Sequence, residues 1–183
     1  MSIEIDVLNG DESWKIAEPL LDMVWPPHVL EKLSWGNVVW AHADLRVFIE
    51  TPRESSSETP QDSLVCHVGI FFRTVTWNRR KVDIAGIGGV ATHPDCRGKG
   101  YASLALNAAV QTMRDREAVG FALLFCEPHN YAFYQARGWH PFNGEVYAEQ
   151  RGARIRFDVL APFVYDFSRA PRDGIIDLCG LPW

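Results

Sequence analysis

The sequence predicts a single domain of the α/β (α+β) class, with a mixed, mostly antiparallel sheet flanked by helices. Strand-like segments come first, and the order strand, helix, strand, helix, strand follows. A glycine-rich junction at 88–102 ends one strand and opens a helix, as expected where a crossover helix leaves a sheet. The length of 183 residues is enough for one domain with a proper core, so we expect one domain over 1–183.

Composition narrows the class of protein. Hydrophobic residues make up 47% and charged residues 22% of the chain, as in ordinary soluble proteins. No apolar run approaches the ~20 residues of a membrane-spanning helix. The first ten residues lack the basic and apolar regions of a signal peptide, so we expect a cytoplasmic protein that contacts no membrane. A formal charge of -5 disfavours nonspecific nucleic-acid binding.

The cysteines are scattered singly and show no C-x-x-C spacing, which argues against a zinc site and favours reduced thiols. We therefore expect no metal. The four positions are Cys66, Cys96, Cys126 and Cys179.

The first half of the chain reads as strand, helix, helix, strand. Alternation at 3–7 predicts a half-buried strand, and apolar residues at helical spacing predict a helix over 11–24. A short helix is expected at 29–33 and a strand at 38–50. The serine- and proline-rich segment 51–63 predicts an exposed loop.

Three tryptophans in this region, Trp25, Trp35 and Trp40, have two interpretations. Packing in the core is the favoured one. The alternative is that they form the wall of a substrate cleft.

The second half alternates strands and helices. The run at 121–126 is continuously apolar, which is typical of a buried central strand. We expect strands at 64–77, 82–92, 121–126, 146–147 and 154–160, a hairpin turn at 78–81, and helices at 98–117 and 129–137.

The junction at 88–102 is a candidate anion site. Backbone N–H groups at a helix N-terminus point outward, and glycines allow a phosphate to approach the main chain. It is not a P-loop, because Gly100 stands where that motif needs Ser or Thr and His93 replaces its first glycine. The G-x-G-x-x-A pattern at 86–91 is not a dinucleotide fingerprint either, because the strand continues through it and Pro94 precedes any helix.

What remains is the pattern R-x-x-G-x-A at 97–102, directly after a strand that carries residues 90–92. The segment FYQARGW follows at 133–139, beyond a further strand. In these features, over roughly 64–142, the sequence resembles the GCN5-related N-acetyltransferase (GNAT) superfamily, whose acetyl-CoA motif has this spacing.

The resemblance implies a GNAT fold with splayed central strands and acetyl-CoA as cosubstrate. Backbone N–H groups over 97–102 would hold the pyrophosphate. The strand at 90–92 would pair with the pantetheine arm, and the N–H of Val90 would polarise the thioester carbonyl. The cofactor-binding residues implied are Val90, Ala91, Thr92, Arg97, Gly98, Lys99, Gly100, Tyr101 and Ala102. The alternative for Arg97 and Lys99 is that they are solvated charges at a helix start.

Tyr134 lies where the family places the tyrosine that protonates the departing thiolate. A phenol stays protonated at neutral pH and can serve as that general acid. The alternative is a packed aromatic residue with its hydroxyl at the surface. Because the family transfers the acyl group directly within a ternary complex, Cys126 is interpreted as structural.

Within the superfamily the chain looks most like the 2-prime aminoglycoside acetyltransferases. In those enzymes the carboxylate of a C-terminal tryptophan reaches the substrate amine, a role that Trp183 would have here; a surface terminus without a role is the alternative. Gly88 occupies the position of their carboxylate base, and Leu181 replaces an expected acidic residue.

A substitute base must therefore take the proton of the incoming amine. Glu127, which ends the apolar strand, is the first choice, and His93 and His129 are the other candidates.

The resulting hypothesis is an N-acetyltransferase that acts on a primary amine of a small molecule, such as an aminoglycoside-like one. Gly88 motivates an alternative, a catalytically degenerate acyl-CoA-binding sensor. A soluble α/β domain with no role for CoA is a third. The sequence does not decide the oligomeric state, and a homodimer is compatible with it.

Overall fold

The computed structural model describes residues 3–51, 63–116 and 119–183. Most of the predicted loop at 51–63 lies outside these residues. The elements are β1 (Glu4–Asn9), α1 (Trp14–Val24), α2 (Pro27–Leu30), β2 (Leu45–Glu50), β3 (Leu64–Trp77), β4 (Arg80–Thr92), η2 (Pro94–Cys96), α3 (Tyr101–Arg114), β5 (Phe121–Cys126), η3 (Pro128–Asn130), α4 (Tyr131–Gln135), β6 (Trp139–Pro141), β7 (Glu145–Gln150), β8 (Ala153–Arg156), β9 (Ala161–Asp166) and β10 (Ile175–Asp177).

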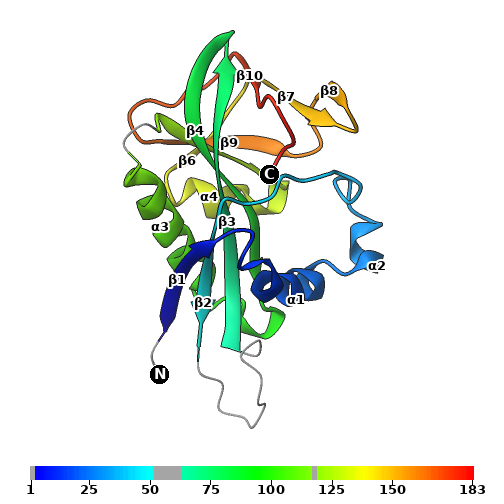
Figure 1. Cartoon of the computed structure of the whole chain (residues 1–183), viewed down its shortest axis with the longest axis vertical. Coiled ribbons are helices and arrows are strands. Elements are labelled where there is room, and N and C mark those ends of the chain that lie inside the picture. The colour runs from blue at the N-terminus through cyan, green and yellow to red at the C-terminus, as the bar shows by residue number, and fades with distance from the viewer. Residues whose placement is uncertain (1–2, 52–62, 117–118) are drawn as a thin grey trace.

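One mixed sheet organises the described chain (Figure 1). Its order is β6-β9-β5-β4-β3-β10-β7-β8, and β2 and β1 continue from the lower part of β3. Most neighbours are antiparallel. Two pairs are parallel: β10 with β7, and β4 with β5, which has α3 in the crossover between its strands. The predicted mixed, mostly antiparallel sheet is confirmed.

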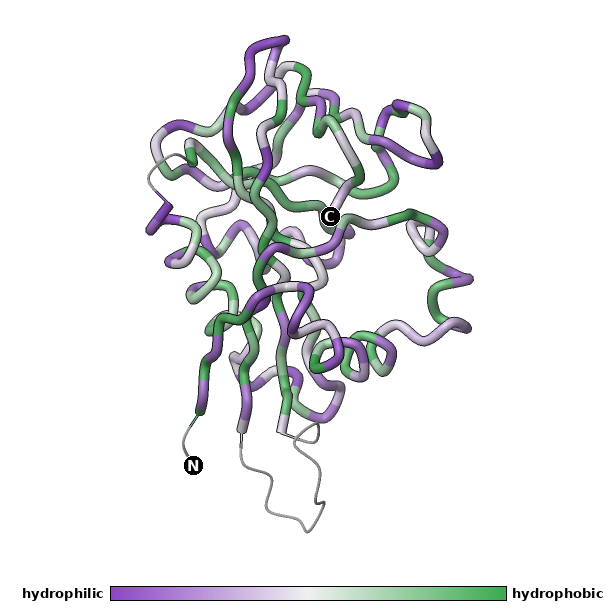
Figure 2. Tube along the Cα trace, in the orientation of Figure 1, coloured by the Kyte–Doolittle hydropathy of each residue, from purple (hydrophilic) through white to green (hydrophobic). Residues whose placement is uncertain are grey.

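Helices cover the two faces of the lower sheet. Alternate residues of β2 face opposite sides: Val47 and Ile49 pack with α3, whereas Phe48 packs with Ala17 and Leu20 of α1. Figure 2 shows hydrophobic positions concentrated along the central strands and hydrophilic ones at the tip of the β3–β4 hairpin. Burial of both faces explains why these strands read as apolar runs.

The β3–β4 hairpin follows directly from its turn. Asn78 and Arg79 have φ values of 47° and 67°, and Trp77 pairs with Arg80 across them. Two residues with positive φ form the turn whose twist matches that of paired strands. The hairpin brings β4 back beside β3 and so delivers the glycine-rich junction to the centre of the sheet.

Several predicted boundaries were wrong. Strand β1 exists, but all of its residues are exposed because it is an edge strand that pairs only with β2 among the described residues. The strand expected at 38–50 begins at Leu45; the preceding backbone instead bonds to the side chain of Gln150 and to the carbonyl of Pro182. The short helix lies at Pro27–Leu30 rather than 29–33.

The C-terminal part shows further differences. The helix expected at 98–117 begins at Tyr101, and the one expected at 129–137 divides into η3 and α4. The strand expected at 154–160 ends at Arg156. Strands β6, β9 and β10 were not predicted, although β9 pairs along the whole of β5. No helix among the described residues is long and apolar enough to span a membrane.

Candidate functional site

The central parallel strands separate in the middle of the sheet. β4 and β5 pair only through Ala85–Ala122, Gly86–Leu123 and Ile87–Leu124. Beyond Ile87, β4 continues to Thr92 while β5 runs on to Cys126 without pairing to it. The backbone of residues 88–92 therefore has no strand partner on its β5 side, so an extended ligand can bind there as an added strand.

A β-bulge lies where the strands separate. Gly88 pairs with Gly69 and Ala91 pairs with His67, so Gly89 and Val90 together oppose a single residue of β3. Gly89 has a φ of 58°, a conformation that glycine adopts without strain. The bulge changes the direction in which the Val90 peptide faces, and Val90 lines the adjacent cavity.

The loop before α3 has the properties of an anion site. Gly100 is the N-cap of α3 with a φ of 88° and no side-chain cap, and Gly98 has a φ of 76°. No described atom lies within 4 Å of the place where a Cβ of either glycine would be. The backbone N–H groups over 98–100 donate to no acceptor among the described residues. These features fit a bound phosphate.

Arg97 and Lys99 lie in the same loop and are exposed. Neither makes an ion pair within the described part of the chain. Both side chains are therefore free to reach a phosphate or to remain in water.

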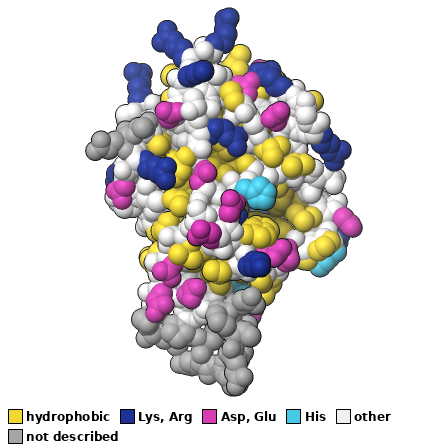
Figure 3. All heavy atoms as spheres, viewed as in Figure 1, with side chains coloured by type: hydrophobic (Ala, Val, Ile, Leu, Met, Phe, Trp, Pro, Cys, Tyr) yellow, Lys and Arg dark blue, Asp and Glu magenta, His cyan; other side chains and the backbone are white. Residues whose placement is uncertain are grey.

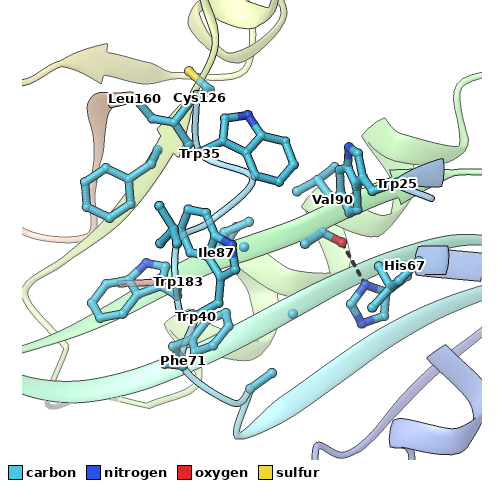
Figure 4. A pocket seen from close by; sticks show the side chains of 18 of the residues that line it. Trp25, Trp35, Trp40, His67, Phe71, Ile87, Val90, Cys126, Leu160 and Trp183 are labelled. Atoms are coloured by element: carbon cyan, nitrogen blue, oxygen red, sulfur yellow. Dashed lines mark hydrogen bonds between the residues drawn. The ribbon is translucent and has the colours of Figure 1, made fainter. Parts of the chain in front are cut away.

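A cavity of about 460 Å³ opens beside the bulge (Figure 4). Of the residues predicted for the site, Val90, Glu127, Tyr134 and Trp183 line it together. Residues 91–92 and 97–102 lie outside its lining, farther along β4 and in the loop before α3. Val90 and the anion site thus occupy successive parts of β4 and the loop that follows it, whereas Glu127 follows β5 and Tyr134 lies in α4.

The wall of the cavity is mainly apolar and is rich in aromatic side chains. Trp25, Trp35 and Trp40 all line it, as the alternative interpretation expected. Core packing, the favoured interpretation, also holds, because Trp35 is buried and the other two pack against hydrophobic core clusters. Trp25 packs edge-on against Trp35, and Trp35 packs edge-on against Trp40, with ring centroids 5.7 and 6.0 Å apart. In Figure 3 hydrophobic side chains gather in the middle of the drawn face, with charged side chains mainly around them. The remaining aromatic residues of the wall are Trp14, Phe71, Phe125, Tyr134 and Trp183.

Trp183 is held at the point where the strands separate. Its indole N–H donates to the carbonyl oxygen of Leu123 at 3.0 Å, and its ring stacks on Phe71 at 5.7 Å. A Cβ at Gly86 would lie 2.1 Å from the indole ring, and one at Gly88 would lie 2.7 Å from the carbonyl carbon of Trp183. Both glycines are therefore needed to seat this residue, and Trp183 is only 4% exposed.

Tyr134 comes from α4 and is 6% exposed. Its ring packs edge-on against Phe133 and Trp139. Burial raises the pKa of this phenol well above its ordinary value, with the Cys126 and Cys66 thiols adding to the effect. The hydroxyl stays protonated at neutral pH, as a proton donor must.

The three candidate bases differ in their position relative to the cavity. Glu127 follows β5 and lines the cavity. His93 is buried beside η2, where its Nδ1 accepts a hydrogen bond from the backbone N–H of Asp95 at 3.2 Å, and His129 is exposed in η3. Neither histidine lines the cavity.

Cys126 also lines the cavity, next to Glu127. Burial and the Glu127 carboxylate raise the pKa of this thiol to about 12. The sulfur is therefore a thiol, not a thiolate, at neutral pH, which disfavours a nucleophilic role.

Two buried polar residues of the cavity wall, Arg46 and His67, were not identified from the sequence. His67 is 1% exposed and Arg46 is 4% exposed. The His67 Nδ1 lies 2.7 Å from the carbonyl oxygen of Gly89, and its Nε2 lies 3.0 Å from the Arg46 Nη1. No sequence pattern links Arg46, His67 and Gly89, because these residues meet only through the pairing of β2, β3 and β4. Among the described residues, no group of three or more His, Cys, Asp or Glu side chains is arranged for a metal ion.

Comparison with known families decides the class of this site. A family model described as an acetyltransferase (GNAT) domain matches residues 37–142, more than half of the chain. The chain belongs to the GNAT acetyltransferase family. Membership confirms the predicted fold class and places the chain among acyltransferases whose cosubstrate is acetyl-CoA. No curated protein sequence matches the chain.

Solved structures share the GNAT fold. Escherichia coli ElaA is 16% identical with a TM-score of 0.58, over 90% of this chain and 100% of that one. A GNAT family acetyltransferase from Brucella melitensis, in complex with acetyl-CoA, is 11% identical with a TM-score of 0.57, over 96% of this chain and 94% of that one.

A GCN5-related N-acetyltransferase from Kribbella flavida is 17% identical with a TM-score of 0.52. The match covers 78% of this chain but 34% of that one, so the chain spans about a third of that protein. Identities this low show the fold alone. The comparisons do not support the closer likeness to the 2-prime aminoglycoside enzymes.

Proposed function

We propose that the chain is an acetyl-CoA-dependent N-acetyltransferase, acting as one domain, that acetylates a primary amine of a small molecule by direct attack. One observation carries this proposal. A single cavity is lined by a candidate oxyanion donor, a carboxylate and a protonated phenol, at Val90, Glu127 and Tyr134. The cavity adjoins the unpaired stretch of β4, which leads to the anion site before α3.

The cosubstrate would lie along β4. The N–H groups over 97–102 would hold the pyrophosphate, with Arg97 and Lys99 within the same loop, and residues 90–92 would pair with the pantetheine. Acetyl-CoA supplies the activated acyl group. The fit is supported by the open space over Gly98 and Gly100 and by their unpaired backbone N–H groups.

Three groups would share the transfer. Glu127 accepts a proton as the amine nitrogen forms its bond to the acetyl carbonyl carbon. The N–H of Val90 stabilises the negative charge that develops on the carbonyl oxygen. As the carbon–sulfur bond breaks and the electron pair moves to sulfur, the hydroxyl of Tyr134 stabilises and protonates the thiolate.

The composition of the cavity indicates the class of acceptor. Its acidic side chains are Asp22 and Glu127, whereas most of the wall is apolar and includes eight tryptophan, phenylalanine and tyrosine residues. An aminoglycoside carries several ammonium groups and hydroxyls that such a wall would not satisfy. We therefore favour an amine with a flat apolar body, whose ammonium group lies near Glu127 and Trp183.

Gly88, which motivates the sensor hypothesis, has another explanation. Its lack of a side chain leaves room for the carbonyl carbon of Trp183, because a Cβ there would approach that carbon to 2.7 Å. A carboxylate side chain would not fit at this position without displacing Trp183. The glycine is thus explained by packing and does not by itself indicate loss of catalysis.

A panel of amines tests the proposed function through thiol release from acetyl-CoA. Tryptamine and 2-phenylethylamine are expected to show kcat/KM values at least about tenfold above that of kanamycin, because aromatic contacts and burial favour them. A preference for kanamycin would overturn the acceptor class, and acetyl-CoA binding without turnover of any amine would favour the sensor.

A further inference from the structure

His67 forms a buried bridge between β2 and the bulge in β4. Its Nδ1 lies 2.7 Å from the carbonyl oxygen of Gly89, an interaction drawn as the dashed line in Figure 4. On its other side, Nε2 lies 3.0 Å from the Arg46 Nη1. The imidazole is 1% exposed. A polar ring buried this completely is held by its two partners.

The chemistry of the partners fixes the proton on the ring. A guanidinium can only donate hydrogen bonds, so the Nε2 of His67 must accept from Arg46. The proton of the neutral ring is then on Nδ1, which donates to the carbonyl oxygen of Gly89. Burial, reinforced by the nearby Arg46 charge, lowers the pKa of His67 to about 4, so the ring is neutral at physiological pH.

Arg46 is itself immobilised. Its Nε donates to the carbonyl oxygen of Gly10 at 2.9 Å, and its guanidinium lies 4.9 Å from the centre of the Trp14 ring. The side chain is 4% exposed. The orientation of the His67 ring is therefore fixed by a guanidinium that the Gly10 carbonyl and the Trp14 ring hold in place.

The carbonyl that His67 holds belongs to the peptide that carries the Val90 N–H. The described residues contain no cis peptide bond, and in a trans peptide the C=O and N–H groups point in opposite directions. Holding the Gly89 carbonyl toward His67 therefore directs the Val90 N–H away from it. Glycine has the greatest backbone freedom of any residue, so at Gly89 this peptide has most need of an external anchor.

We propose that His67, oriented by Arg46, is a positioning residue that fixes the Gly89–Val90 peptide so that the Val90 N–H points at the thioester carbonyl oxygen. The inference rests on the proposed function, since it assigns the oxyanion donor to Val90. His67 acts by keeping the donor pre-oriented. Loss of His67 is expected to weaken polarisation of the thioester carbonyl more than it lowers the affinity for acetyl-CoA.

Two substitutions separate the two contacts of His67. In His67→Asn, the amide nitrogen can replace Nδ1 and still donate to Gly89. In His67→Gln, the longer side chain reaches the position of Nε2 and keeps the contact with Arg46 but not the one with Gly89. Both variants remove the imidazole, so a role in packing alone predicts the same result for the two.

Infrared spectroscopy of bound [1-13C]acetyl-CoA is the test, because it needs no acceptor. The wild-type carbonyl band is expected at lower frequency than in free acetyl-CoA. In His67→Gln the band should return toward the free value and kcat with tryptamine should fall at least about tenfold, with little change in the KM for acetyl-CoA. His67→Asn should retain most of the band shift. Equal shifts in the two variants would overturn the proposal.

A measurement on the wild-type protein tests the proposal even if the variants do not fold. A long-range 1H–15N NMR spectrum at pH 7 should show His67 as the Nδ1–H tautomer, and the Nε2–H or doubly protonated form would overturn the proposal. If wild-type protein does not bind acetyl-CoA, the proposed function fails. If it binds but shows no carbonyl shift, the assignment of the oxyanion donor fails while cosubstrate binding stands.

Discussion

Replacing Tyr134 with phenylalanine is expected to lower kcat for acetyl transfer at least about a hundredfold, the range typical of losing a general acid. The substitution removes only the hydroxyl of a residue that lines the cavity. The ring contacts with Phe133 and Trp139, at centroid distances of 5.2 and 6.4 Å, are retained. Stability and the affinity for acetyl-CoA should therefore change little.

The pH dependence adds a second readout for this residue. Because burial raises the pKa of the Tyr134 phenol above its ordinary value, the group stays protonated as the pH rises through the usual assay range. Wild-type activity should not fall at alkaline pH through ionisation of this residue.

Tyr131→Phe is the matched control for the Tyr134 variant. Tyr131 lies in the same helix and packs on Phe163, but it does not line the cavity. Steady-state thiol release compares the two variants. Full kcat in Tyr134→Phe would contradict the assignment of the acid.

Replacing Glu127 with glutamine is expected to lower kcat/KM for amine acceptors about a hundredfold or more at neutral pH. Glutamine has nearly the same shape but cannot accept the proton of the incoming amine. The loss should become smaller with acceptor amines of lower pKa, because these arrive already deprotonated. Rates measured over a series of amines with different pKa values test this dependence.

His129, another candidate for the general base, supplies the control variant for Glu127. His129 is exposed in η3 and does not line the cavity, so His129→Gln should leave the rate unchanged. An unaffected Glu127→Gln enzyme together with an impaired His129→Gln enzyme would transfer the role of base to the histidine.

The parts of the fold that were predicted correctly have local signals. Strands β3 and β5 begin and end at the expected residues. β5 is a continuous apolar run, β3 is rich in β-branched and aromatic residues, and both are bounded by polar residues or turn formers. The anion loop was found by its spacing of arginine and glycines. These features depend on neighbouring residues, which a sequence displays directly.

Non-local partners explain what could not be predicted. Residues 38–44 read as a strand, but their backbone bonds to Gln150 and Pro182 and they contribute to the cavity wall. Strand β9 contains Pro162, a residue that is rare in central strands, and it forms through pairing with distant β5. A histidine within an apolar strand gives no sign that its partners are Arg46 and a glycine carbonyl on two other strands.

The interpretation of Gly88 changed most. In the sequence, Gly88 occupies the position where the 2-prime aminoglycoside enzymes have a carboxylate base. In the structure, its lack of a side chain leaves room for Trp183. A sequence shows which side chain is absent but not which distant residue fills the space. The aromatic part of the cavity wall comes from segments far apart in the sequence, at 14, 25–40, 71, 125, 134 and 183, and could be assembled only from the fold.

Titration calorimetry with acetyl-CoA tests most directly whether the separated β4 and β5 strands and the loop before α3 form a cosubstrate site. One molecule per chain is expected to bind, with a dissociation constant between about 1 μM and 1 mM as for typical enzyme substrates. Gly98→Asp, which places a carboxylate in the open space of the loop, should abolish the binding by repelling the pyrophosphate. The absence of any binding heat or thermal stabilisation of the wild-type protein at millimolar acetyl-CoA would contradict the account.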